Sequence, residues 1–381
     1  MGPLMRLLIA ALCLSLAGTA FAAEFSHQDV IERLRSEGGS VATDAEGQAI
    51  GVNLTSTWIT DADLALVAKL PKLETIDLSL TKITDIGLEH LKKLENVRHL
   101  RMHHAEYLTD GGIAQIKGWK KLDSLDLRGT KVTSRVLEHI RTLTTLTALD
   151  LSHTEVTDSG FEKLAELTRL ERLAIGGNRI LGPGLDLLKM ITTLRHLDVG
   201  GIQRVDSGLW GLALNEANMH RLAQLTQLES LNLSGANIAD RGLDRPGHEL
   251  ARRKELHSLP RINPLVNLRE LDLTRTAVDN ADLAVVTQLP KLRRLRVGYA
   301  SNIDDGAASI FLRLPQLENL YLTETNVGDA TLDALQQSKS LRKLAVGGTK
   351  VSAERVARFR AARPDCELVW WAPAGETSSK D

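Results

Sequence analysis

Three histidines lie close together in one short stretch of the chain, and imidazole is a common ligand for zinc. They are His99, His103 and His104. If this stretch is a strand, His99 and His103 lie about 13 Å apart, whereas zinc holds each ligand at about 2.1 Å. The neighbours His103 and His104 would point to opposite faces of the strand. The spacing therefore predicts no metal site.

The motifs that mark common enzyme classes are absent from the sequence. It has no G-x-S-x-G segment, no H-E-x-x-H pair and no G-x-x-x-x-G-K-[ST] loop. Three glycine pairs, at 176–177, 200–201 and 347–348, are compatible with phosphate binding, but all three fall at the same point of a repeated unit, where a tight turn needs glycine. We therefore predict a protein that is not an enzyme and holds no cofactor.

The repeated unit has about 24 residues and must position any other functional side chain. Copies read PKLETIDLSLTKITDIGLEHLKKL (71–94) and TTLTALDLSHTEVTDSGFEKLAEL (144–167), with the shared pattern L-x-x-L-x-L-x-x-T-x-[IV]-T-D-x-G-L-x-x-L-x-x-L. Twelve copies cover about residues 47–371. They begin near Gly47, Pro71, Glu95, Lys120, Thr144, Thr168, Thr192, Thr226, Val266, Pro290, Pro315 and Lys339.

This pattern resembles the leucine-rich repeat, whose L-x-x-L-x-L signature recurs every 20–29 residues. The I-T-D-x-G-L half is similar to the cysteine-containing subclass of that repeat and to secreted bacterial proteins built from it. In two copies of 25 residues the ninth position is Ala105 or Ala300, where that subclass often carries Cys or Asn. The resemblance implies an α/β solenoid shaped as an arc or horseshoe.

The residues of a single copy predict the same fold. Ile76 and Leu78 have the alternate spacing of a strand buried on one face, and Leu88 and Leu91 recur at helical spacing. Thr84 can cap the helix. One copy cannot bury both faces, so the copies must stack, with a parallel sheet on the concave face and short helices on the convex face.

The third and fifth positions of L-x-x-L-x-L face away from the core and form two columns on the concave sheet. The fifth column places Arg101 between Asp77 and Asp126, and Asp150 follows. The adjacent acids Asp126 and Asp150 suggest a cationic ligand. The alternative is that Leu-Asp-Leu is simply the commonest form of this repeat.

Further along the sheet the columns predict ion pairs between neighbouring strands. Asp272 should face Arg296, and Glu270 should face Arg294. Such surface pairs contribute about 0–1 kcal/mol each, so we expect them to fix the register of the strands. The candidate partner-binding residues of the whole chain are Asp77, His99, Arg101, Asp126, Asp150, Arg294, Arg296, Tyr321, Arg252 and Arg253.

Two neighbouring copies are longer than the others, with insertions near residues 210–221 and 243–262. Long irregular segments in compact folds are often functional. The second insertion is rich in basic residues, including Arg252 and Arg253, and predicts a protrusion that contacts a partner. The alternative is a longer convex helix with a solvated basic face.

The amino-terminal residues 1–22 are typical of a secretory signal peptide. Arg6 is followed by an apolar run and an Ala-Phe-Ala cleavage site. An uncleaved anchor is the alternative. No other segment approaches the roughly 20 apolar residues that cross a bilayer, so we expect no membrane insertion once the signal is removed. The chain should be secreted, periplasmic or on the cell surface.

Both ends of the solenoid need segments that cover its open core. Residues 23–46 should form the first cap, with a helix over 26–37. At the other end we expect a helix over 355–362 and an edge strand within 364–371 that buries Cys366. Residues 372–381 should be a disordered tail.

The charges nearly cancel, with 47 basic and 48 acidic residues, so we expect neither nucleic acid nor an anionic membrane as a partner. The leading hypothesis is a non-catalytic module, of unknown oligomeric state, that binds a protein partner on the concave sheet or on the basic insertion. One alternative is a structural component of the cell envelope or surface that assembles through the solenoid. The other is a glycan-binding accessory protein.

Cleavage of the signal peptide can be tested by mass spectrometry of the exported protein. The mature chain should begin at or next to Ala23, because the Ala-Phe-Ala site ends at Ala22. An exported protein that retains residues 1–22 would contradict this prediction.

Overall fold

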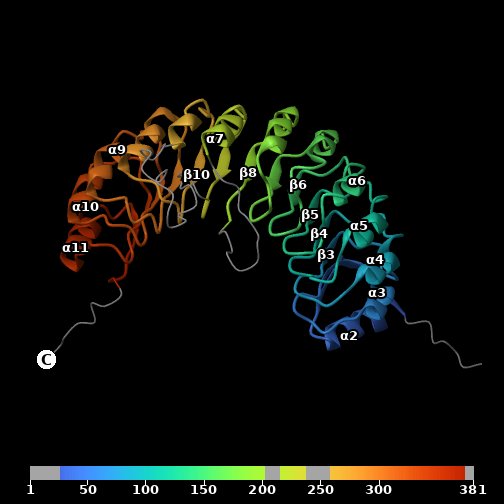
Figure 1. Ribbon diagram of the computed structural model, residues 1–381. Coiled ribbons are helices and arrows are strands. Elements are labelled where there is room, and N and C mark those ends of the chain that lie inside the picture. Colours follow the sequence, from blue (N-terminus) through green and yellow to red (C-terminus); the bar gives the residue numbers. More distant parts are fainter. Residues whose placement is uncertain (1–25, 202–214, 237–257, 374–381) are drawn as a thin grey trace, which may run out of the picture.

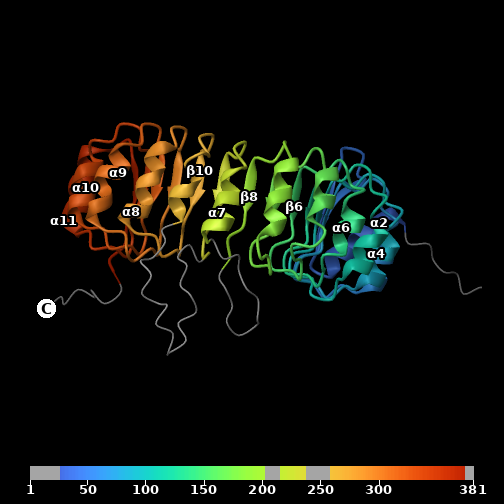
Figure 2. The same ribbon diagram turned by 45° about the horizontal axis from the view of Figure 1, so that its top comes forward.

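The computed structural model describes residues 26–201, 215–236 and 258–373 of the chain, which form an arc (Figure 1). The sheet lines the inner side of the arc, and the helices cover the outer side (Figures 1 and 2). The predicted signal peptide lies outside the described residues, as does the predicted tail from residue 374 onward. None of the described helices is long and apolar enough to cross a membrane.

One sheet of fourteen strands runs through the described part of the chain, with the strands in sequence order. β1 and β2 are antiparallel, and every later strand is parallel to the one before it. The strands are β1 (Ser40–Thr43), β2 (Ala49–Asn53), β3 (Thr75–Asp77), β4 (His99–Arg101), β5 (Ser124–Asp126), β6 (Ala148–Asp150), β7 (Arg172–Ala174), β8 (His196–Asp198), β9 (Ser230–Asn232), β10 (Glu270–Asp272), β11 (Arg294–Arg296), β12 (Asn319–Tyr321), β13 (Lys343–Ala345) and β14 (Glu367–Val369).

The convex side carries one short helical segment or a pair of them in each repeat. These are α3 (Asp61–Val67), α4 (Asp85–Leu91), α5 (Asp110–Gln115), α6 (Val136–Ile140), η1 (Phe161–Glu166), η2 (Pro183–Met190), α7 (Glu216–Ala223), η4 (Leu259–Ile262), α8 (Asn280–Leu283), η5 (Ala284–Gln288), η6 (Asp305–Ala307), α9 (Ala308–Leu312) and α10 (Asp329–Leu335), where η marks a 3₁₀ helix. The predicted solenoid, with its concave parallel sheet and convex helices, is confirmed.

Each of the twelve predicted copies contributes one strand, from β2 to β13. Within the copy that contains β5, Leu122, Leu125 and Leu127 are all buried, and Leu137 and Ile140 of α6 pack behind them. Burial of apolar surface contributes about 25 cal/mol per Å². The leucine positions of the repeat therefore hold the strand against the helix.

A helix lies at each end of the repeats, where the sequence predicts the two capping segments. At the start, α2 (His27–Ser36) begins with a capping box between Ser26 and Asp29. At the far end, α11 (Ala353–Ala362) and β14 cover the last repeat, and Cys366 is buried there. Burial raises the pKa of the Cys366 thiol, so this cysteine is a packing residue that resists forming the reactive thiolate.

The predicted insertions are described only in part. Residues 216–221 belong to α7 and 259–262 form η4, and these two helices contact each other on the convex side. α7 also contacts η2 of the preceding repeat. The remaining parts of the insertions, 210–214 and 243–257, lie outside the described residues.

A ladder of hydrogen bonds along the T-D motif joins successive repeats. The aspartate of one repeat accepts bonds from the backbone N–H and the hydroxyl of the threonine in the next. Asp61 accepts both bonds from Thr84, at 2.8 and 2.7 Å, and Asp110 accepts both from Thr133, at 2.9 and 2.7 Å. Thr84 and Thr109 of this motif also cap α4 and α5, so the same motif caps helices and joins neighbouring repeats.

The glycine of T-D-x-G-L is required by the same ladder. A Cβ at Gly112 would lie 2.6 Å from Oδ1 of Asp85 and 3.1 Å from Leu88. A Cβ at Gly87 would lie 2.5 Å from Oδ1 of Asp61. Any side chain at these positions would push the repeats apart.

Removal of one ladder carboxylate should destabilise the fold. Oδ1 of Asp305 accepts from the backbone N–H of Gly328 (2.7 Å) and from the N–H and hydroxyl of buried Thr331 (3.0 and 2.5 Å). Asp305→Ala should lower the free energy of unfolding in urea by about 1–3 kcal/mol, because Thr331 loses its acceptor. Asp305→Asn keeps an oxygen at Oδ1 and is the matched control. Equal losses in the two variants would contradict the role of this acceptor.

Candidate binding groove on the concave face

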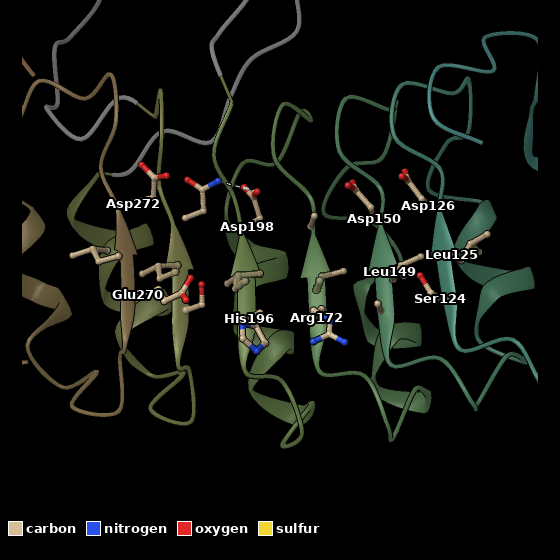
Figure 3. A pocket seen from close by; sticks show the side chains of 18 of the residues that line it. Ser124, Leu125, Asp126, Leu149, Asp150, Arg172, His196, Asp198, Glu270 and Asp272 are labelled. Atoms are coloured by element: carbon tan, nitrogen blue, oxygen red, sulfur yellow. Dashed lines mark hydrogen bonds between the residues drawn. The ribbon is translucent and has the colours of Figure 1, made fainter. Parts of the chain in front are cut away.

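A groove of about 470 Å³ runs across the concave face of β5 to β11. Its floor includes small side chains, among them Ser124, Ala148, Ala174 and Ser230, which leave room above the sheet. The third and fifth positions of successive strands supply its polar side chains, as the repeat pattern predicts (Figure 3). The strands on either side satisfy the backbone of each central strand, so a ligand in the groove meets side chains.

Along the central strands, the two columns place acidic side chains at one edge of the groove and basic side chains at the other. Asp126, Asp150 and Asp198 lie near the edge of the sheet where the strands end, which we call the ending edge (Figure 3). Arg172 and His196 lie nearer the opposite edge, where the strands begin, which we call the starting edge (Figure 3). Across β5 to β8, a ligand lying over the strands therefore meets acids on one side and basic groups on the other.

The column of aspartates has a structural cause that the sequence analysis did not identify. Oδ1 of the fifth residue accepts a hydrogen bond from the backbone N–H two residues later, at 2.7–3.0 Å, which turns the chain at the end of the strand. This turn occurs at Asn53, Asp77, Asp126, Asp150, Asp198, Asn232 and Asp272. The recurring Leu-Asp-Leu thus closes each strand with one carboxylate oxygen and leaves the other oxygen for a neighbour or a ligand.

The second carboxylate oxygen, Oδ2, separates these aspartates into two groups. Oδ2 of Asp198 accepts from Asn232 at 2.9 Å, and Oδ2 of Asp272 lies 3.5 Å from Arg296. In Asp126 and Asp150, Oδ2 has no hydrogen bond or ion pair with any residue that the structure describes. These two carboxylates are the ones that can receive a ligand.

Burial raises the pKa of Asp126, and the charge of neighbouring Asp150 adds to this effect, against the hydrogen bond from the Arg128 backbone. Burial likewise raises the pKa of Asp198. Both carboxylates are thus harder to ionise than an exposed aspartate. A bound cation would relieve the repulsion between Asp126 and Asp150.

The other predicted site residues fall on the same face or outside the described chain. Arg101, Arg294 and Arg296 line the groove with Asp126 and Asp150. The neighbouring positions Asp77, His99 and Tyr321 lie on β3, β4 and β12 beyond its lining. Arg252 and Arg253 lie outside the described residues.

The predicted ion pairs between neighbouring strands are confirmed. Glu270 lies 2.6 Å from Arg294, and Asp272 lies 3.5 Å from Arg296. Arg101 lies between Asp77 and Asp126 in register but pairs with Asp77, at 3.9 Å. Asp126 therefore keeps its second oxygen free of Arg101.

The prediction that His103 and His104 point apart is wrong. Their rings pack edge to face with centroids 4.3 Å apart. β4 ends at Arg101, and His104 has φ of +53°, so the alternation of a strand does not extend to this pair. No group of three or more metal-ligating side chains occurs within the described residues.

The glycine pairs serve turn geometry, as predicted. Gly177 and Gly348 have φ of +71° and +68°, in the left-handed region. A Cβ at Gly176 would lie 1.7 Å from the carbonyl oxygen of Gly200. The backbones of neighbouring turns therefore approach too closely for any side chain at Gly176.

Arg172, His196 and Asp198 are among the groove-lining residues that were not predicted candidates. Asp198 belongs to the fifth column, and Arg172 and His196 to the third. The repeat register was sufficient to place them on this face. Only the curvature of the sheet shows that these three residues line the same groove as the other residues of β5 to β11.

Comparison with known proteins identifies this architecture. The sequence pattern of the leucine-rich repeat region matches residues 64–310, which is more than half of the chain. The chain belongs to the leucine-rich repeat family. No curated protein sequence matches it significantly.

Solved bacterial structures are similar to this chain at low sequence identity. An internalin (InlF) from Listeria monocytogenes is 19% identical, with a TM-score of 0.55, over 91% of this chain and 94% of the internalin. A leucine-rich repeat protein from Leptospira interrogans is also 19% identical, with a TM-score of 0.41, over 81% of this chain and 87% of the other. The internalin likeness shows a shared fold along nearly the whole repeat array.

The raised pKa of Asp126 predicts a pH-dependent effect of neutralising it. A raised carboxyl pKa means that the native state holds the proton more readily than the unfolded chain, so ionisation costs stability as the pH rises. Asp126→Asn keeps the acceptor for Arg128 and should unfold at higher urea concentration than the wild type at pH 7. The difference in stability between variant and wild type should shrink as the pH falls toward 3.8, the ordinary pKa of aspartate. A gain that is constant with pH would contradict the prediction.

Proposed function

We propose that this leucine-rich repeat protein is an exported, non-catalytic module that binds a protein partner in the concave groove over β5 to β11. The observation that carries the proposal is the pair of carboxylates on adjacent strands, Asp126 and Asp150, whose second oxygens have no partner within the described residues. Solenoids commonly present their concave surface to partners, and this fold-level analogy supports the choice of face.

The charges of the groove favour a partner segment with a cationic side chain. A lysine or arginine placed over Asp126 and Asp150 would form charge-assisted hydrogen bonds with both carboxylates. It would also lower their mutual repulsion. The same acids would repel the phosphates of a nucleic acid, which supports a protein as the partner of this face.

Residues 1–22 support export, because they combine a basic start, an apolar run and a small-residue cleavage site. The T-D-x-G-L half of the repeat supports membership of the cysteine-containing subclass in a bacterial protein. The described residues form a groove lined by both acidic and basic side chains, and they contain no group of three or more metal-ligating side chains. A binding role accounts for this groove without requiring any catalytic step.

Photo-crosslinking in the cells that make the protein tests the binding face. A benzoylphenylalanine at Ala148, on the groove floor, should capture a discrete protein, whereas one at Glu89 on the convex helix α4 should not. Asp126→Lys with Asp150→Lys should remove at least 90% of the adduct, because each change places a cation where the partner's cation binds.

The matched control is Glu46→Lys with Glu155→Lys, the same charge change at exposed positions away from the groove. This variant should retain the adduct. An adduct at Glu89 alone would indicate assembly through the convex surface and overturn the proposal. An adduct at Ala148 that survives the reversal of Asp126 and Asp150 would overturn the role of these carboxylates.

A further inference from the structure

A second, smaller pocket lies at the starting edge of the sheet, just before the strands β4 to β7. Its volume is about 210 Å³. Its lining residues are Arg98, Lys120, Lys121, Asp123, Thr145 and Arg169. Four cationic side chains thus surround a single carboxylate, so the formal charge of the lining is 4 − 1 = +3.

The cations of this pocket differ from other arginines on the same edge. Further along the starting edge, Arg269 pairs with Glu229 at 3.5 Å, and Arg293 pairs with Glu318 at 3.3 Å. Arg342 likewise pairs with Asp365 at 3.1 Å. Each of these arginines is neutralised by an acid from a neighbouring repeat.

No such neutralisation occurs in the pocket. Arg98, Lys120, Lys121 and Arg169 form no ion pair with any residue that the structure describes. Asp123 likewise has no ion pair with the described residues. The positive charge of this pocket is therefore available to a ligand, whereas Arg269, Arg293 and Arg342 on the same edge are paired with acids.

Hydrogen bonds hold the pocket in shape before any ligand arrives. Nζ of Lys121 donates to Asn96 at 2.7 Å, and the hydroxyl of Thr145 donates to the carbonyl oxygen of Leu122 at 2.7 Å. The carbonyl oxygen of Arg98 accepts from the backbone N–H of Asp123 and of Ser124, at 2.8 and 3.0 Å. The side chains thus extend from backbone that the strand pairing already fixes, which lowers the entropy cost of binding.

We infer that this pocket binds a linear polyanion that carries phosphate or sulfate groups. Guanidinium groups match the oxygen geometry of such groups with paired N–H donors, and lysine ammonium groups add point charge. Neighbouring strands are about 4.8 Å apart, so Arg98 and Arg169, three repeats apart, are separated by about 14 Å. A chain of anionic groups can extend along this row of cations and meet several of them at once, which a single oxyanion does less well.

This site is independent of the concave groove. Ser124 contributes to the groove floor, while the preceding Asp123 lines the pocket at the edge. The groove favours cationic groups along the ending edge, and the pocket favours anionic groups at the starting edge. The two sites can be tested separately, because their residues and their charge preferences differ.

Calorimetric titration of the full chain with tripolyphosphate and with a heparin-derived hexasaccharide tests the inference. The wild type should bind at least one of these two probes, and the affinity should fall as salt is added. The phosphate probe and the sulfated glycan distinguish two sources of the same chemistry. Inorganic phosphate alone should bind at least tenfold more weakly, because it cannot span the pocket.

Arg98→Gln with Arg169→Gln should weaken binding about tenfold or more. The matched control, Arg269→Gln with Arg293→Gln, removes two arginines from the same edge that are already paired, and should change the affinity less than twofold. Asp123→Asn should strengthen binding, because it removes the one repelling charge; a misfolded variant would not produce this gain. Asp126→Lys with Asp150→Lys should leave polyanion binding within twofold of the wild type.

The inference would be overturned by wild-type protein that binds neither probe at low salt, or by equal losses in the pocket and control variants. Affinity for duplex DNA that equals the affinity for both probes and depends equally on Arg98 and Arg169 would also overturn it. That result would indicate a nucleic-acid site in place of a site for a flexible linear polyanion.

Discussion

A single repeat of this chain cannot bury its own leucines, and every other feature of the molecule depends on that constraint. Leu125 of β5 and Leu137 of α6 lie in a core that is open toward the next repeat until that repeat covers it. Stacking closes the apolar core. It also brings polar backbone groups of adjacent repeats together, and these need partners as well. The Asp–Thr ladder supplies those partners at the same places in successive repeats.

The same stacking explains why one column of aspartates can be both structural and functional. Each fifth-position carboxylate uses Oδ1 to close the end of its strand, so the residue type recurs whether or not a ligand binds. Whether Oδ2 has a partner depends on the side chain at the same position of the neighbouring strand. Asn232 satisfies it in Asp198, and Arg296 lies beside it in Asp272. At Asp126 and Asp150 no described side chain of a neighbouring strand bonds this oxygen, since Arg101 beside Asp126 pairs with Asp77, and both carboxylates stay open to a ligand.

The two edges of the sheet therefore carry unbalanced charges of opposite sign. Acids gather at the ending edge of the central strands, and unpaired basic side chains gather at the starting edge before β4 to β7. In both places the charged side chains have no ion-pair partner among the described residues. Many charged residues elsewhere on the solenoid are paired with a residue of opposite charge. A repeat protein can thus build distinct binding surfaces on one scaffold by changing which column positions have a complementary neighbour.

The sequence by itself determined the repeat period, the strand register, the caps and the faces of the sheet, because every copy must bury leucine at the same positions. This register also predicted the ion pairs of Arg294 and Arg296. Only the tertiary structure decided which charges stay unpaired, how His103 packs on His104, and that Arg98 and Arg169 share a pocket. These features depend on side-chain directions and on contacts between residues distant in sequence. The leucine repeat determines the course of the backbone, but it does not determine these contacts between surface side chains.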